Sequence, residues 1–274
     1  MDRFLPFFKH FPLAARVFYA GQLCGTSSDH TTGAVGHVHV LRSGVLHLTD
    51  KRGRRSTVKE PSVLLFLHPE QHTFQSDGAD LVCAFVDFGA GTLNPLASSL
   101  PSYLALPLSS MVELRPTIDL LFSEAFDRKD GRQVAVDRLT EYLLILIFRF
   151  LLTSNLIQGG LLMALSDSRL ARVIAAILDA PERAWTLEEL GKKAGMSRAR
   201  FAAHFLAITG QTPFEYLAVW RIGVAQSLLK KGKPLKMIAP SVGFASSGAL
   251  IRSFSRHVGM PPMAWLAVQQ NGEI

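Results

Sequence analysis

An internal repeat in the last hundred residues constrains the fold more than any other feature of the sequence. Landmark residues recur 48 positions apart before a predicted turn and 49 positions apart after it. The pairs are Leu190 and Ile238, Gly195 and Gly243, Met196 and Phe244, Ser197 and Ser246, Phe205 and Phe254, Gly210 and Gly259, and Pro213 and Pro262. Each copy has the pattern of a helix, a glycine at its end, a serine N-cap and a second amphipathic helix. The repeat therefore predicts two helix-turn-helix motifs, at about residues 186–208 and 235–258.

The two copies differ in how well they satisfy the rules for helix formation. In the first copy, Thr186 and Glu189 have the spacing of a capping box. In the second copy, Pro240 falls inside the expected first helix and would cost about 3 kcal/mol if that helix is continuous there. A helix that begins only near Ile238 would hold the proline in its first turn at little cost. We expect the segment from Pro213 to Lys231 to form a rod between the motifs.

The net charge of +7 comes entirely from the C-terminal part of the chain. Residues 1–165 contain 15 Lys and Arg against 15 Asp and Glu, whereas residues 166–274 contain 14 against 7. A basic module joined to a neutral one indicates a polyanion-binding unit attached to a unit with another role. Charge alone does not separate DNA from RNA or a membrane surface.

The repeat resembles the DNA-binding domain of AraC/XylS transcription regulators over about Asp167 to Leu266. The residues that carry the resemblance are Trp185-Thr186-Leu187-Glu188-Glu189-Leu190, Ala194-Gly195-Met196-Ser197, Phe205, Gly210, Thr212-Pro213, Tyr216-Leu217, Arg221, Ala225, Leu228-Leu229, Val242-Gly243-Phe244, Phe254 and Gly259-Met260-Pro261-Pro262. It implies an effector-modulated, sequence-specific transcription regulator, and leaves open whether the protein is an activator or a repressor. The implied partners are double-stranded promoter DNA, RNA polymerase and a second copy of the chain, without a membrane.

In that family, the exposed face of each second helix reads base edges. The matching residues here are Arg198, Ala199, Ala202 and Ala203 in the first motif, and Ser247, Gly248, Ile251 and Arg252 in the second. Arg252 is the best candidate for a base contact, because a guanidinium can pair with guanine O6 and N7, which is worth about 1–3 kcal/mol. Four further basic residues, Arg200, Arg256, Lys192 and Lys193, are expected to contact phosphates.

The alanine at position 203 departs from the family pattern, because relatives often carry arginine or another long polar side chain there. Together with Ala202 it leaves the first motif few groups that can hydrogen-bond to bases. We therefore expect this motif to read mainly thymine methyl groups and DNA shape.

The N-terminal half has a different periodicity. Short alternating stretches joined by Gly, Asp and Pro turns run from Val17 to Phe88 and predict a β-sandwich or barrel. Helical spacing follows in Glu113–Arg128 and Val134–Ile157, and Ser154–Asp167 is the candidate linker. The predicted class is α+β, with a barrel, helices and an all-α domain in that order.

The stretches Gly36–Gly44, Glu60–Phe66 and Pro69–Phe74 resemble the cupin domain that precedes the DNA-binding domain in many such regulators. This resemblance implies a cupin-like effector-sensing domain over residues 1–112, a helical dimerisation or linker region over 113–165, and a DNA-binding domain over 166–270. Tyr142–Leu152 matches the dimerisation helix.

Histidines are concentrated in the cupin-like stretch. His37 and His39 share one face of a strand, and with His72 they are candidates for an effector pocket. By analogy with metal-binding cupins, His30, His37 and His72 could hold a divalent metal. The usual glutamate is absent, so we expect a small-molecule effector rather than a metal, and no firm cofactor.

Several classes of protein fit poorly. The first residues lack the pattern of a secretory signal, and the longest apolar run has 11 residues, which is too short to span a bilayer. We therefore expect a cytoplasmic protein with Cys24 and Cys83 as reduced thiols, although a redox-sensing role for the pair stays open.

The sequence has no pattern of a nucleophile with a neighbouring base, so we expect the protein not to be an enzyme. The alternatives are a metal-dependent cupin enzyme with a DNA-binding tail, or a nonspecific nucleic-acid-binding protein.

Overall fold

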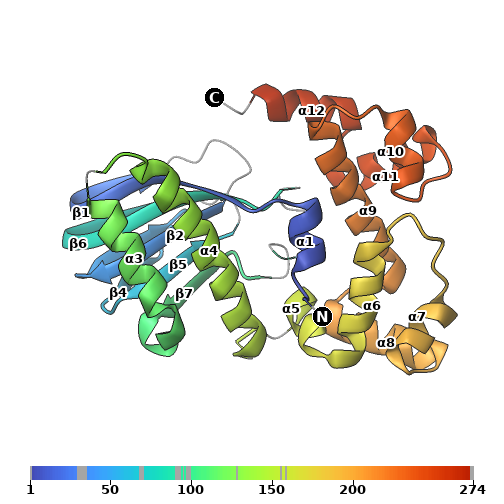
Figure 1. The fold of residues 1–274 in the computed structure, drawn as a ribbon, viewed down its shortest axis with the longest axis horizontal. Helices are drawn as coiled ribbons and strands as arrows, with labels where there is room; N and C mark the ends of the chain where they lie inside the picture. The colour runs from blue at the N-terminus through green and yellow to red at the C-terminus, as the bar shows by residue number, and fades with distance from the viewer. Residues whose placement is uncertain are drawn as a thin grey trace. The chain divides into compact units, whose positions relative to one another are not determined.

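The computed structural model describes residues 2–29, 36–67, 71–89, 94, 96, 100–127, 129–154, 156–157 and 159–271 (Figure 1). The described residues form two compact units. The sheet unit comprises those within Leu13–Phe88 and Leu100–Phe150. The helical unit comprises those within Met1–Pro12, Gly89–Ser99 and Leu151–Ile274.

The sheet unit is built on one seven-stranded antiparallel sheet. Its strands are β1 (Ala14–Asp29), β2 (Gly36–Ser43), β3 (Leu46–Asp50), β4 (Arg55–Val58), β5 (Ser62–Phe66), β6 (His72–Asp87) and β7 (Tyr103–Pro107). The long strand β6 pairs with β1 along one edge, and on the other edge it pairs first with β3 and then with β2. The strands β4, β5 and β7 extend the sheet beyond these neighbours, which gives a half-barrel.

Strand β2 is buried on both faces because the sheet has an inner face and a helix-covered outer face. Val38 and Val40 point to the outer face, and Arg42 on the same face places its guanidinium 4.6 Å from the ring centroid of Phe122. This phenyl ring belongs to α3 (Arg115–Phe126), which with α4 (Arg132–Thr153) lies along the sheet in Figure 1. The short 3-10 helices Leu108–Ser110 and Val112–Leu114 lead into α3.

The helical unit contains nine described helices. They are α1 (Leu5–His10), α5 (Gly160–Ser166), α6 (Ser168–Asp179), α7 (Leu187–Ala194), α8 (Arg198–Thr209), α9 (Pro213–Lys230), α10 (Leu235–Ser241), α11 (Ser247–Val258) and α12 (Pro262–Asn271). The predicted α+β class, with a barrel-like N-terminal part and an all-helical C-terminal part, is confirmed. None of these described helices, nor α3 or α4, has the length and apolarity required to cross a bilayer.

The candidate linker 154–167 contains the helix α5, and its apolar residues are packed rather than solvated. Leu161 and Leu162 of α5 are buried, and α5 packs on α6 and α8. The apolar residues of this segment therefore belong to the core of the helical unit rather than to a solvated connection.

The N-terminal helix α1 also belongs to the helical unit. Phe7 and Phe11 contact the ring of Trp220 in α9 edge-on, with centroids 5.4 and 4.9 Å apart. All three side chains are almost completely buried. The sequence contained no periodic signal for this contact, because a six-residue helix shows too few turns to reveal which face is buried.

Candidate nucleic-acid interface and histidine cluster

The first motif begins with the capping box that the sequence predicts. The backbone N–H of Glu189 donates to the Thr186 hydroxyl at 3.2 Å, and the Glu189 carboxylate accepts from the Thr186 backbone N–H at 2.9 Å. Helix α7 ends at Gly195, whose φ of +66° is left-handed, and Ser197 then caps α8 by accepting from the Arg200 N–H. Both ends of the turn are thus satisfied locally.

The outer face of α8 combines two arginines with an apolar patch. Arg198, Ala199, Arg200 and Ala203 are exposed, whereas Ala202 is half-buried. Ala202 and Ala203 line a shallow groove together with Leu187, Leu206, Thr212, Pro213 and Phe214. The two alanines therefore form part of a continuous apolar surface, which the sequence pattern of α8 alone did not reveal.

The second motif has a shorter and less regular first helix. Helix α10 starts at Leu235, because the Ile238 N–H already bonds to the Pro234 carbonyl. The start near Ile238 is therefore wrong, and Pro240 is the sixth of seven helical residues. Pro240 has no N–H to donate to the carbonyl of Lys236, four residues earlier, and α10 ends one residue later.

The turn of the second motif requires glycine for two reasons. Gly243 has a φ of +80°, and a Cβ atom there would lie 2.8 Å from the backbone oxygen of Glu182. The guanidinium of Arg221 also lies against Gly243 and donates to the backbone oxygens of Pro181 at 2.7 Å and Arg183 at 2.9 Å. Arg221 of α9 thus joins the segment before the first motif to the turn of the second.

The outer face of α11 carries more hydrogen-bonding capacity than that of α8. Ser246, rather than Ser247, is the N-cap, since its hydroxyl accepts from the Ala249 N–H at 3.2 Å. Gly248, Arg252 and Arg256 are exposed, while Ser247 and Ile251 are half-buried. The four candidate base-reading residues of α11 therefore lie on one accessible side of the helix.

Two of the candidate phosphate contacts are engaged in weak surface interactions. Lys192 pairs with Glu188 at 2.7 Å, and this hydrogen bond lowers the pKa of the Glu188 carboxyl. The Lys193 ammonium lies 5.6 Å from the ring centroid of Trp185. Because both lysines are exposed, these interactions are worth little and a phosphate can compete with them.

A polar contact that the sequence did not indicate ties the first recognition helix to α6. Asp167 caps α6 by accepting from the N–H groups of Arg169 and Leu170, and its other oxygen accepts from His204 Nε2 of α8 at 2.7 Å. Partial burial raises the pKa of Asp167, but the His204 and backbone hydrogen bonds outweigh it, so the pKa is lowered. This contact fixes α8 against the beginning of the domain.

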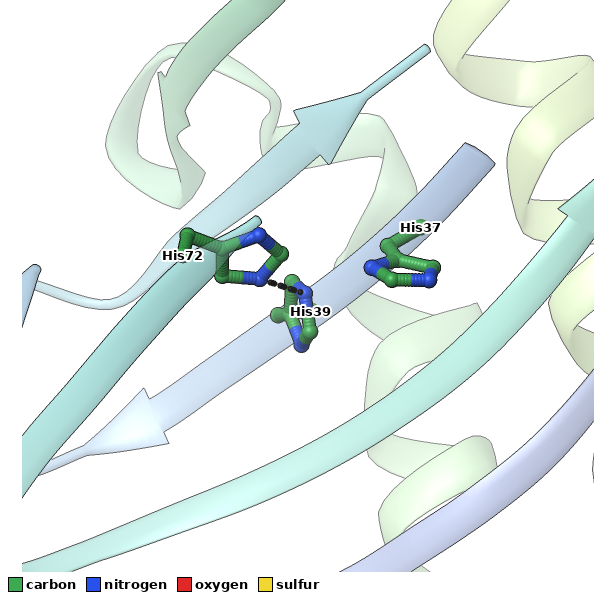
Figure 2. A group of neighbouring side chains, drawn as sticks. All are labelled: His37, His39 and His72. Atoms are coloured by element: carbon green, nitrogen blue, oxygen red, sulfur yellow. Dashed lines mark hydrogen bonds between the residues drawn. The ribbon is translucent and has the colours of Figure 1, made fainter. Parts of the chain in front are cut away.

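The histidine cluster lies on the inner face of the half-barrel (Figure 2). His37 and His39 come from β2, His72 begins β6, and all three are at least 97% buried. His72 Nε2 and His39 Nε2 are 3.0 Å apart in a hydrogen bond. One ligand atom from each ring lies within 4.8 Å of those of the others.

The curvature of β6 brings these residues together. Cys83, the β6 partner of His39, lies 11 residues from His72, which is about 36 Å along a straight strand. The 3.0 Å contact between His39 and His72 therefore requires β6 to bend round the sheet. The sequence pattern placed His37 and His39 on one face correctly but could not give this curvature.

The surroundings of the cluster are aromatic. Phe66 stacks on His72 with parallel rings 3.9 Å apart, and Phe74 meets His39 edge-on at 4.6 Å. Burial, followed by the neighbouring His72 and His37, holds the pKa of His39 well below its ordinary value. His39 is thus neutral near neutral pH. The candidate ligand His30 lies outside the described residues.

Two helix pairs define a helix-turn-helix DNA-binding protein: in each, the exposed second helix begins at a serine N-cap, and both pairs contact α9. Residues 6–153 match the family described as Cupin, and residues 190–267 match the Helix-turn-helix domain family. The chain belongs to the AraC family of helix-turn-helix transcriptional regulators with an N-terminal cupin domain.

Named relatives agree with this assignment. An uncharacterized HTH-type transcriptional regulator of Haemophilus influenzae is 34% identical over 61% of this chain and 56% of its own length. The RCS-specific HTH-type transcriptional activator RclR of Escherichia coli is 30% identical over 82% of this chain and 81% of its own length. The chain thus spans little more than half of the first relative. Both relatives are transcriptional regulators rather than enzymes, as expected for this chain.

A solved structure of the DNA-binding domain of AdpA, the global transcriptional factor, in complex with a target DNA is similar to part of this chain. It is 32% identical, covers 38% of this chain and 94% of its own, and has a TM-score of 0.36.

Proposed function

We propose that the protein binds promoter DNA in a sequence-specific manner through α8 and α11, and that an effector in the sheet unit modulates this binding. The observation that carries the proposal is the attachment of both motifs to α9, with Arg221 joining the approach to the first motif to the turn of the second. A shared rod allows two recognition helices to enter successive major grooves on one face of DNA, about 34 Å apart.

The two recognition helices have different roles in this proposal. Arg252 contacts a guanine, with Ser247, Gly248 and Ile251 beside it. Arg198, Ala199, Ala202 and Ala203 read methyl groups and groove shape. The remaining basic residues, Arg200, Arg256, Lys192 and Lys193, contact phosphates and set the register without specifying sequence.

The sheet unit supplies the sensing function in this proposal. His37, His39 and His72 mark the effector site, because they are three buried imidazoles gathered among apolar and aromatic side chains of the inner face. Effector binding changes how the helical segment between residues 113 and 165 presents the DNA-binding domain over 166–270.

Further proposed partners are a second copy of the chain and RNA polymerase, in the cytoplasm where promoter DNA is found. Within the expected dimerisation segment 142–152, Tyr142 and Arg149 are exposed, whereas Leu143, Leu144, Ile147 and Phe148 are buried in the sheet unit. A dimer through α4 would therefore use the exposed side that includes Tyr142.

The test begins with selection of bound sequences from a random DNA library and from genomic fragments. Competition binding then compares the selected sites with random DNA at the same salt concentration, since affinity depends strongly on salt. We expect a preference of at least about 10³-fold for the selected sites. Equal affinity would contradict the proposal and favour the nonspecific nucleic-acid-binding alternative.

A further inference from the structure

The three histidines of the inner face form an arrangement that hydrogen bonding alone explains poorly. The rings of His39 and His72 contact Phe66 and Phe74, which belong to an apolar wall with Leu41, Leu64, Leu81 and Cys83. The ring of His37 contacts Phe18 and Phe85. Polar groups in such a wall are costly unless they find partners. Within the described residues, His39 Nδ1 is buried and has no hydrogen-bond partner, while His39 Nε2 bonds only to another imidazole.

The separation of the ring nitrogens matches a metal site. Ligands of a tetrahedral zinc ion at the usual Zn–N distance lie about 3.3 Å from one another. His39 Nε2 and His72 Nε2 are already 3.0 Å apart, and all three candidate atoms lie within 4.8 Å of one another. Small side-chain rotations on the same backbone would bring the third nitrogen into that range.

We propose that His37, His39 and His72 bind one divalent transition-metal ion, for which zinc is the best match. Imidazole nitrogen suits Zn²⁺, Co²⁺, Ni²⁺ and Cu²⁺, whereas Mg²⁺ and Ca²⁺ prefer oxygen ligands. Three protein ligands leave a fourth position for water or an effector atom.

The strands fix the ligands before a metal arrives. His37 and His39 are two residues apart on β2, which is paired on both edges, and Phe66 stacks on His72. Such preorganisation reduces the ordering needed on binding. The ligand set is His37, His39 and His72 rather than the His30, His37 and His72 combination that sequence analogy suggests.

An effect of metal binding on DNA binding would rest on the proposed function. Metal binding by the three histidines does not depend on it. Metal binding is measured on the full chain without DNA, and DNA binding is measured separately. Failure of one measurement therefore does not hide failure of the other.

The experiment titrates the metal-free full chain with Zn²⁺ by calorimetry and with Co²⁺ by visible absorption. We expect one ion per chain and the intense d–d absorption of low-coordinate Co²⁺. His39→Phe places an apolar ring among Phe66 and Phe74 and removes one ligand. His47→Ala is the matched control, because His47 is exposed and hydrogen-bonds to Thr57 outside the cluster.

His39→Phe should weaken metal binding by more than the roughly 10–100-fold that loss of an outer-shell partner causes. His47→Ala should bind as the wild type does. Thermal unfolding with and without zinc provides a second readout, since a metal that binds only the folded chain raises its Tm. We expect this rise in the wild type and His47→Ala but not in a folded His39→Phe or His72→Gln variant.

Two results would overturn the proposal. One is the absence of stoichiometric Zn²⁺ or Co²⁺ binding by folded wild-type protein. The other is equal binding and an equal rise in Tm in the wild type and in the His39→Phe and His72→Gln variants, which would place the ion elsewhere on the chain.

Discussion

The two helix-turn-helix motifs share a sequence pattern but differ in the capping of the first helix and in the side chains that the second helix exposes. The first has a reciprocal capping box and a turn glycine with open space around it, yet its outer face is alanine-rich. The second has Pro240 within a seven-residue helix and no side-chain cap at Pro234, yet it exposes Arg252. The first motif thus has the more stable first helix, and the second motif has the side chain better suited to base recognition. The contacts of Arg221 from α9 hold the turn that follows the less stable helix α10.

The largest expected effect is a difference in stability between alanine substitutions at the two turn glycines, Gly195 and Gly243. Gly195→Ala should lower the free energy of unfolding by about 1–2 kcal/mol, the cost of a left-handed alanine. Gly243→Ala should cost clearly more, because its Cβ would also approach the Glu182 carbonyl oxygen to 2.8 Å. Urea unfolding of both variants checks this order. Equal losses would mean that the turn of the second motif shifts freely and that Arg221 does not hold it.

The next effect concerns base recognition. Arg252→Ala should lose about 1–3 kcal/mol of discrimination at one guanine of the selected site. Ala203→Ser, at the matching position of α8, keeps the Cβ atom and should change discrimination at its own half-site by less than Arg252→Ala does. Competition binding to single-base variants of the site measures both. Unchanged affinity and base preference in Arg252→Ala would contradict the proposed role of α11.

The capping box of the first motif should contribute a smaller amount. Thr186→Ala removes the hydroxyl that accepts from the Glu189 N–H and should cost about 1 kcal/mol of stability. Thr186→Ser keeps the hydroxyl and is the matched control. If calorimetry gave the same Tm for both variants, the cap would be irrelevant to the stability of this motif.

Acid should weaken the first motif more than the second. The backbone N–H of Thr186, followed by the Arg183 side chain, lowers the pKa of Glu189. A lowered pKa contributes stability above the unfolded pKa and loses it as the pH falls through the folded value. Hydrogen exchange from neutral pH down to about pH 3, which lies below the ordinary Glu pKa of about 4.3, should therefore show earlier loss of protection in α7 than in α10. The reverse order would contradict this account.

The smallest effect concerns phosphate contacts. Lys192→Ala should leave stability almost unchanged, because its pair with Glu188 is exposed. It should reduce the slope of log affinity against log salt by about 1, equally for selected and random DNA. Arg172→Ala, an exposed change on α6, should leave the slope unaltered. An altered sequence preference in Lys192→Ala would show that this lysine reads bases.

The sequence predicted local features better than long-range ones. The repeat, the Thr186 capping box and the glycine-ended helices follow from rules that act within a few residues. The burial of α1 against Trp220 and the meeting of His39 with His72 depend on packing and strand curvature, which have no local pattern. Pro240 shows the same limit, because tertiary contacts hold a helix that propensity disfavours.

The most direct test of the central claim is a hydroxyl-radical footprint of the full chain on a selected site. Two motifs fixed on α9 predict two protected stretches on one face of the DNA, with centres about 10–10.5 base pairs apart. Gly243→Ala should weaken the stretch assigned to α11 first, while the stretch of α8 persists. A single protected stretch in the wild-type footprint, or uniform protection without a repeat, would contradict the account of two reading helices on one rod.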